Sequence, residues 1–296
     1  MEAIIIEGLV YGIMVLGVYI SFRIMDFPDL TVDGSFVTGA AIMAIAIINK
    51  YSFFYSLILA FAGGAIAGAA TAIIHNKLKI PNLLAGILTM TMLYSINLRI
   101  MGSPNLPLLK NETIFTVIAH LTRNFFSSEI AILILCLFSI IVIKLLLDLF
   151  FHTDIGLAIR ALGSNEQMVI AQGINPEVLK IIGLSISNGI VALSGAFAAQ
   201  YQGFADVGMG PGTIIAGLAS VLIGEFFIRS RRLWIKTTAA IIGSIIYRAI
   251  LFMGMSFGYG FVKLNPNDNK FISGALILLF LFLSRLKINQ KRKNYD

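Results

Sequence analysis

The feature that most constrains this chain is a series of continuously apolar runs, each of the length, about 20 residues, that a helix needs to cross a bilayer. A spanning helix satisfies its own backbone hydrogen bonds, whereas the strands of a spanning barrel alternate apolar and polar residues, which these runs do not. Charged residues make up only 12% of the chain, against about 25% in soluble domains. The sequence therefore predicts an all-α, polytopic membrane protein without strands.

We expect about nine spans, and the ends of the runs leave room for eight to ten. The predicted spans cover residues 3–22, 34–49, 53–74, 81–101, 129–150, 179–201, 213–228, 235–255 and 270–285. No linker or change of composition divides them, so residues 1–296 are expected to form one transmembrane domain.

The orientation follows from the basic residues, because cytoplasmic loops carry an excess of Lys and Arg. Fourteen lie on one side of the predicted spans: Arg23, Lys77, Lys79, Arg160, Lys180, Arg229, Arg231, Arg232, Lys236, Arg285, Lys287, Lys291, Arg292 and Lys293. Five lie on the other: Lys50, Lys110, Arg123, Lys263 and Lys270. This asymmetry places the N-terminus and loop 102–128 outside, and the C-terminus and residues 151–178 in the cytoplasm. The net charge of +7 is then an orientation signal that requires no nucleic acid, and the basic tail is placed to attract anionic lipid.

Two glycine-interrupted segments echo one another. Residues 34–41 and 212–219 both follow the pattern Gly, hydroxyl, apolar, two residues, Gly, any residue, Ala, and each follows a proline and an aspartate. They enter the membrane from opposite sides, as in an inverted repeat whose interrupted helices line a solute path. The alternative is that small residues simply allow close helix packing. The candidate path residues are Asp29, Asp33, Gly34, Gly39, Gly212, Gly217 and Arg248.

Charged groups inside predicted spans are candidates for function because they are costly to bury in lipid. Arg248 lies within the eighth span and either lines the path or forms half of a buried ion pair. The aspartates before the second span, Asp29 and Asp33 among them, either line the path or cap the helix that follows. Lys144 and Asp148 are four residues apart and are expected to form a structural pair on one helix face.

Enzymatic chemistry finds little support in the sequence. No GxxxxGK[ST] motif is present, so the chain cannot hold a nucleotide in a P-loop. Ser194 could act as the nucleophile of an intramembrane protease only with a histidine at membrane depth, and the three histidines lie near span ends. They are also too far apart to suggest a metal site. We therefore expect no catalytic residue, metal or cofactor on this chain.

The most specific signal is the cytoplasmic stretch 151–178. We expect a short helix from Ile155 to Leu162 that ends at Gly163, and a second that begins at Asn165-Glu166 and runs to Gly173. Such a rigid element at the cytoplasmic face would let a soluble motor move the spans.

This stretch carries a family resemblance. Its characteristic residues are the run Thr153-x-x-Gly156-x-x-x-Arg160-Ala161-x-Gly163-x-Asn165, followed by Ala171-x-Gly173-Ile174. This pattern resembles the coupling-helix region of bacterial ABC importer permeases of the branched-chain amino acid and ribose class. Three further segments match the same class: DFPDLTVDGSFVTGAA, LKIPNLLAGILTMTMLYSINLRIMGSPN and GMGPGTIIAGLASVLIGE. The resemblance therefore covers residues 3–285. Within the class, the chain is most similar to the tryptophan/tyrosine-type and otherwise uncharacterised permeases.

The resemblance implies a multi-pass permease in the bacterial plasma membrane that imports an amino acid, within the narrower group an aromatic one. It further implies a second permease chain, usually identical, two ATPase subunits that hold ATP and Mg, and an extracellular solute-binding protein. The ATPase contact would fall on Gly156, Arg160, Ala161, Gly163, Asn165, Glu166 and Gly173. The alternative from another class is a self-contained secondary transporter with Asp33 or Glu225 as its proton-coupled carboxylate.

Overall fold

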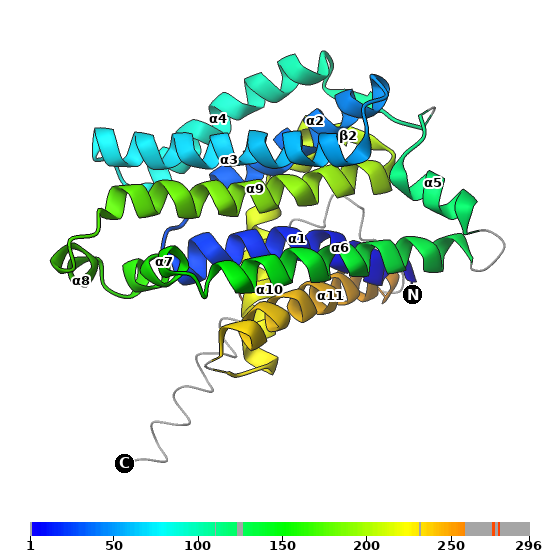
Figure 1. Cartoon of the computed structure of the whole chain (residues 1–296). Helices are drawn as coiled ribbons and strands as arrows, with labels where there is room; N and C mark the ends of the chain where they lie inside the picture. Colours follow the sequence, from blue (N-terminus) through cyan, green and yellow to red (C-terminus); the bar gives the residue numbers. More distant parts are fainter. Residues whose placement is uncertain are drawn as a thin grey trace.

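The computed structural model describes residues 2–109, 111–122, 127–230, 232–257, 274–275 and 278, most of them in helices (Figure 1). The first half contains α1 (Glu2–Val18), the π-helical turn η1 (Tyr19–Ile24), α2 (Thr31–Ile48), α3 (Phe53–Leu78), α4 (Asn82–Met101), β1 (Asn105–Pro107), α5 (Ile114–Leu121) and α6 (Ser128–Phe150). The second half contains α7 (Asp154–Ser164), α8 (Glu166–Ala171), α9 (Pro176–Gln202), β2 (Phe204–Asp206), the 3₁₀ turn η2 (Val207–Met209), α10 (Thr213–Phe227) and α11 (Leu233–Phe257).

Eight helical segments in the described part of the chain are long and apolar enough to cross a membrane. They coincide, within a few residues at each end, with the first eight spans predicted from the sequence. The predicted ninth span, 270–285, lies almost wholly outside the described residues.

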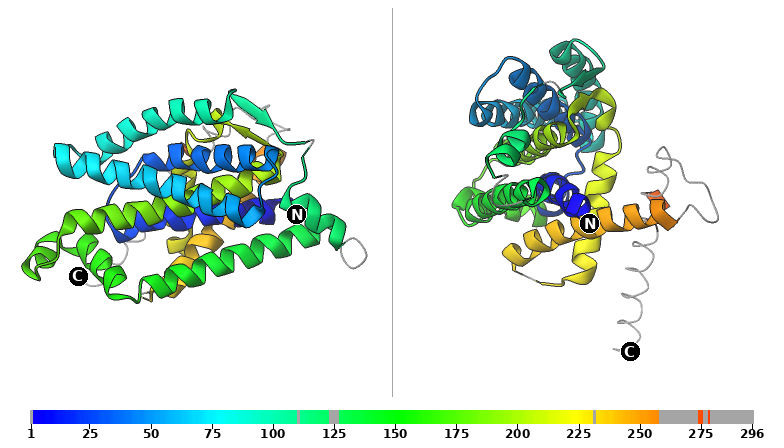
Figure 2. Two further views of the ribbon diagram at one scale, coloured as in Figure 1. Left: turned by 45° about the horizontal axis from the view of Figure 1, so that its top comes forward. Right: turned by 90° about the vertical axis from the view of Figure 1, so that its right-hand side faces the viewer.

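The centre of the bundle is built from α1, α2 and α9, whose apolar residues are mostly buried. By contrast, α3, α4 and α6 bury a third or fewer of theirs, and large side chains such as Ile58, Ile66 and Phe138 are exposed on them. An exposed apolar face costs little in lipid, so these three helices form the outside of the bundle. Most of the helices run roughly along one direction, whereas α10 crosses them steeply in both Figure 1 and Figure 2.

The two ends of the bundle carry different connections. The N-terminus, the β1–β2 pair and α5 lie at one end, and α7 and α8 lie at the opposite end (Figures 1 and 2). This separation agrees with the opposite placement of loop 102–128 and residues 151–178 that the basic residues predict. Which end faces the cytoplasm remains a prediction.

The expectation of no strands was wrong in detail. Asn105–Pro107 pairs antiparallel with Phe204–Asp206, and Leu106 lies opposite Ala205. Three-residue strands are too short to show a period of two, so no pattern in the sequence reveals them. The pairing satisfies backbone groups of both connections and joins the loop after α4 to the chain leaving α9.

Irregular backbone interrupts the bundle at two places that both adjoin the start of α2. The first is the break between η1 and α2, where Asp26 adopts a left-handed backbone conformation with φ of 51°. The second connects β2 to α10, and its Gly210 is packed directly on the backbone carbonyl of Asp33. Non-helical backbone at membrane depth is tolerated only where protein or a water-filled cavity surrounds it, and here the first turns of α2 cover the second break.

Candidate functional site

Asp33 connects the two breaks. Its carboxylate accepts hydrogen bonds from the backbone N–H of Gly212 (2.9 Å), the hydroxyl of Thr213 (2.8 Å) and the backbone N–H of Ile214 (2.8 Å). The first N–H groups of a helix have no partner within the helix, and the N-cap residue of α10, Gly212, has no side chain to supply one. Asp33 on α2 therefore serves as the cap of α10, whereas the sequence-based alternative had it cap α2, the helix in which it lies.

Asp29 anchors a buried polar chain in the same region. It accepts the N–H of Thr31 at 2.9 Å and the side-chain amide of Asn188 at 2.7 Å. The carbonyl oxygen of Asn188 in turn accepts the hydroxyl of Ser35 at 2.7 Å. All four residues are at most 1% exposed, and buried polar groups need such partners. The chain holds the first break against the middle of α9, away from any open surface.

A small pocket lies where both breaks meet α4. It has a volume of about 30 Å³ and is lined by Asp33, Gly34, Tyr94, Asn97 and Pro211, among others. The Asn97 amide donates to the Gly34 carbonyl at 3.2 Å, and its own buried side-chain oxygen has no partner among the described residues. Two of the candidate path positions, Asp33 and Gly34, thus line this pocket beside α4, and a third, Gly212, is bonded to Asp33.

Gly39 and Gly217 lie where two helices pack closely, and not beside an open cavity. A Cβ at Gly39 would overlap the Ala192 carbonyl on α9, and one at Gly217 would lie 2.9 Å from a methyl group of Val18 on α1. Both positions fit the packing alternative, while their role in a path remains a prediction. Gly212 differs, because its φ of 97° is a conformation that side-chain-bearing residues rarely adopt.

The charged groups of the spans that the sequence singled out are paired. Arg248 lies 3.3 Å from Glu7 and 3.7 Å above the ring of Tyr11, as expected for half of an ion pair. Glu225 lies 2.7 Å from Arg23. Lys144 and Asp148 form the expected pair at 2.5 Å, and Asp148 also accepts the Thr237 hydroxyl. Asp33 thus holds three donors of α10, and Glu225 pairs with an arginine.

At the opposite end from β1–β2, α7 and α8 form a short helical elbow. The first helix continues through Gly163 to Ser164, so the expectation that Gly163 ends it was wrong. The bend lies at Asn165, which is extended and caps α8 by accepting the N–H of Met168 at 3.1 Å. The loop beyond α8 then turns at Gly173, with φ of 77°.

Gly163 has a packing role that its reading as a helix terminator missed. A Cβ there would overlap the carbonyl oxygen of Ile24, the last residue of η1, and one at Gly156 would overlap the end of α6. Ala161 packs on the same core. The elbow is therefore pressed directly on the end of the first span and on the break that follows it.

Other groups of the elbow face outward. Glu166 is exposed and pairs with Lys180 of α9 at 2.8 Å. Arg160 lines a hollow of about 490 Å³ between α7, η1 and α11. The large side chains of Leu157, Met168 and Ile170 are 47–48% exposed, which leaves an apolar patch beside these charges.

Asn188, Ser35 and Asn97 were not singled out from the sequence. The only signal was a polar residue within an apolar run, and that signal is shared by many serines and threonines that bond to their own helix. What separates these three is a partner on another helix, which only the structure reveals.

Comparison with known proteins decides the family. Residues 1–281 match the family described as "Branched-chain amino acid transport system / permease component". The chain belongs to this family of permease components. Its resemblance to ABC importer permeases of this class is thereby confirmed.

Two relatives match over nearly their whole length. The permease is 41% identical to the tyrosine transport system permease protein of Clostridioides difficile (strain R20291), over 99% of this chain and 94% of that one. It is 34% identical to the uncharacterized protein RP368 of Rickettsia prowazekii (strain Madrid E), over 95% of each. Among solved structures, PsaBC from Streptococcus pneumoniae in complex with Fab is similar with a TM-score of 0.51 and 15% identity, covering 94% of this chain and 89% of that one. The last likeness concerns the fold alone.

Proposed function

We propose that this permease is the membrane-spanning subunit of an ATP-driven importer for an amino acid, with tyrosine as the first candidate. Family membership supports a transport subunit, and the solute is suggested by the printed name of the C. difficile relative. As a subunit of a bacterial importer, it would lie in the plasma membrane with α7 and α8 in the cytoplasm.

The observation that carries the proposal is the contact between Gly163 and Ile24. Because α7 lies directly on the backbone at the end of the first span, a displacement of α7 acts on the break before α2. The break leads directly into α2, whose first turn carries Asp33, and Asp33 holds the start of α10. An external motor acting on the elbow would therefore reach both interrupted segments through packed backbone, without a flexible linker between them.

The outward side of the elbow is suited to an ATPase partner. It exposes the apolar side chains of Leu157, Met168 and Ile170, and Arg160 adds a positive charge. Apolar contact contributes affinity to an interface, and charge helps to fix its register. The partner would bring the ATP and Mg, since no nucleotide motif lies on this chain.

A second copy of the chain would cover α4. This spanning helix exposes Thr91, Tyr94 and Ser95, polar groups poorly suited to hydrocarbon. Pairing two copies along α4 would place the solute path between them, next to the pocket at Asp33 and Gly34. The end with β1–β2 and α5 would then receive the extracellular solute-binding protein.

The test uses the permease co-expressed with a P-loop ATPase and a secreted binding protein whose genes adjoin its own. Leu157→Glu and Met168→Glu change exposed side chains, so the fold should survive while ATPase co-purification and tyrosine uptake into vesicles fall strongly. Leu109→Glu, an exposed apolar position at the other end, is the matched control and should retain the ATPase. Uptake driven by a proton gradient without ATP, or full ATPase retention by both elbow variants, would overturn the proposal.

A further inference from the structure

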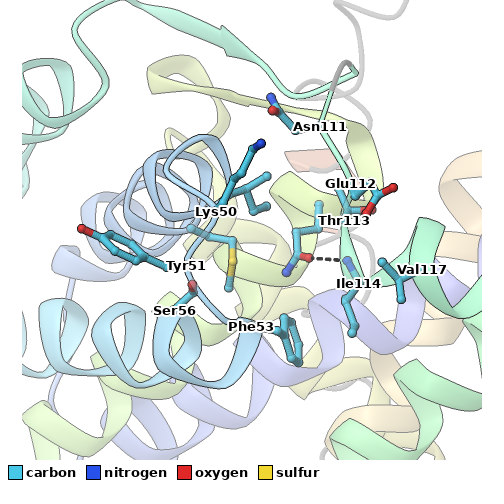
Figure 3. Close-up of a pocket in the computed structure, with 12 residues that line it drawn as sticks. Lys50, Tyr51, Phe53, Ser56, Asn111, Glu112, Thr113, Ile114 and Val117 are labelled. Atoms are coloured by element: carbon cyan, nitrogen blue, oxygen red, sulfur yellow. Dashed lines mark hydrogen bonds between the residues drawn. The ribbon is translucent and has the colours of Figure 1, made fainter.

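A large hollow lies at the end that carries β1–β2 and α5, between the α2–α3 turn, the start of α5 and the end of α9. Its volume is about 580 Å³, within the range of small-molecule sites. Figure 3 shows Lys50, Tyr51 and Ser56 on one side of it and Glu112, Ile114 and Val117 on the other. It shares no lining residue with the pocket beside Asp33.

The hollow combines an apolar floor with two opposite charges. Met43 and Phe53 contribute apolar surface, and the ring of Phe53 is held edge-on to Phe197 with 6.0 Å between centroids. Lys50 and Glu112 are exposed on facing sides, and neither makes an ion pair in the part of the chain that the structure describes. A single bound molecule could therefore meet a cation on one side and an anion on the other.

An unpaired amide adds a third polar group. Gln200 is only 4% exposed, and its side-chain oxygen accepts the backbone N–H of Ile114 at 3.1 Å. That bond fixes which way the amide points, because only the carbonyl can accept. The Nε2 group is left without a hydrogen-bond partner among the described residues. A buried donor without an acceptor is costly, and a ligand acceptor in the hollow would remove that cost after a small adjustment.

We infer that this hollow binds a free zwitterionic L-α-amino acid. Lys50 and the Gln200 amide take the carboxylate, Glu112 takes the ammonium group, and an apolar or aromatic side chain lies over Phe53. The inference rests on the proposed function, because it provides a place at the expected outer end where the solute is held before it crosses. It extends that function by assigning recognition of the amino-acid backbone to this chain itself.

The experiment is equilibrium dialysis of the purified full-length permease in lipid nanodiscs against each of the twenty common L-amino acids. We expect saturable binding of tyrosine. Tyramine, which lacks the carboxylate, and 3-(4-hydroxyphenyl)propionate, which lacks the ammonium group, should compete at least about tenfold more weakly, the effect of losing one charge-assisted hydrogen bond.

Three variants locate the binding. Lys50→Gln and Glu112→Gln change exposed side chains and should each weaken binding by about tenfold or more. Gln200→Glu keeps an acceptor for Ile114 but places a negative charge where the carboxylate binds, and should abolish binding. Arg99→Gln and Glu129→Gln remove charges near the same end but outside the hollow, and should leave the affinity unchanged.

The inference fails if no amino acid binds saturably, if both analogues compete as well as tyrosine, or if Lys50→Gln and Glu112→Gln bind normally. Equal displacement by phosphoethanolamine would also overturn it and assign the hollow to a lipid headgroup. ATP-driven uptake by the assembled transporter separates the two proposals. Uptake without amino-acid binding in the hollow would contradict only this inference. Amino-acid binding without ATP-driven uptake would contradict only the proposed function.

Discussion

The carboxylate of Asp33 accepts a hydrogen bond of 2.8 Å from the backbone N–H of Ile214, a residue 181 positions later in the chain. A helix is usually capped by the residue just before it, but here the cap comes from another spanning helix. The start of α10 is therefore fixed to α2, and the stability of the two helices should depend on this one side chain.

Replacing Asp33 tests this dependence. Asp33→Ala leaves three donors without an acceptor and should lower the free energy of unfolding by about 3 kcal/mol. Asp33→Asn keeps a carbonyl oxygen and should cost about 1 kcal/mol. Thermal unfolding of the purified protein in detergent gives the ranking. Asp26→Asn, the same change at an exposed aspartate of the same break, should have no measurable effect, and an equal loss there would contradict the capping role.

Asn188 should be the most sensitive polar residue of α9. Asn188→Ala removes the partner of both Asp29 and Ser35, leaves two buried polar groups unpaired, and should cost about 2–4 kcal/mol. Ser35→Ala removes only one end of the chain and should cost about 1 kcal/mol. The two single variants and the double variant, compared by thermal unfolding, measure the coupling. Purely additive losses would show that the three residues do not act as a chain.

Gly39→Ala separates packing from passage at a predicted path residue. The added methyl group overlaps the backbone of Ala192, which cannot move aside alone, so we expect a loss of about 2 kcal/mol or more and a lower yield of folded protein. Gly12→Ala is the matched control, because the one close atom its Cβ would meet is the end of the Ile140 side chain at 2.9 Å, and the next lie at 3.7 and 3.9 Å. Size-exclusion chromatography measures the folded fraction. A fully folded Gly39→Ala that no longer transports would instead favour a role in the path.

The membrane orientation can be tested by cysteine labelling in intact cells. Asn111 lies at the end with α5 and Asn165 at the bend between α7 and α8. An impermeant thiol reagent should label Asn111→Cys and should reach Asn165→Cys only after permeabilisation. The native Cys136 is 2% exposed and should give little background, which the wild-type chain controls. Labelling of Asn165→Cys alone in intact cells would reverse the orientation.

The spans could be predicted from the sequence because each depends on its own residues. Hydrophobic length fixes where a helix can cross, and the breaks before Thr31 and Thr213 follow from Pro and Gly nearby. The elbow was also predicted, although Gly163 was assigned a local role as a helix terminator. Its actual role depends on Ile24, a residue that no local pattern relates to it.

The parts that escaped prediction all depend on contacts between distant segments. Asp33 was predicted either to line the path or to cap the helix that follows it, but the helix it caps is α10, whose Thr213 lies 180 positions later in the chain. The β1–β2 pair depends on two strands of three residues each, which carry no periodic signal of their own. The Nε2 group of Gln200 is left unpaired because the side-chain oxygen is held by the backbone N–H of Ile114, 86 positions away.

The Asp33 carboxylate also sets how α2 and α10 can part. Its three hydrogen bonds converge on two oxygen atoms, so a shift of α10 by about 1 Å weakens all of them together. The three hydrogen bonds should therefore form together and break together. In a transport cycle, α2 and the start of α10 should then move as one rigid unit. If they separate, the free energy of all three hydrogen bonds is lost in a single step.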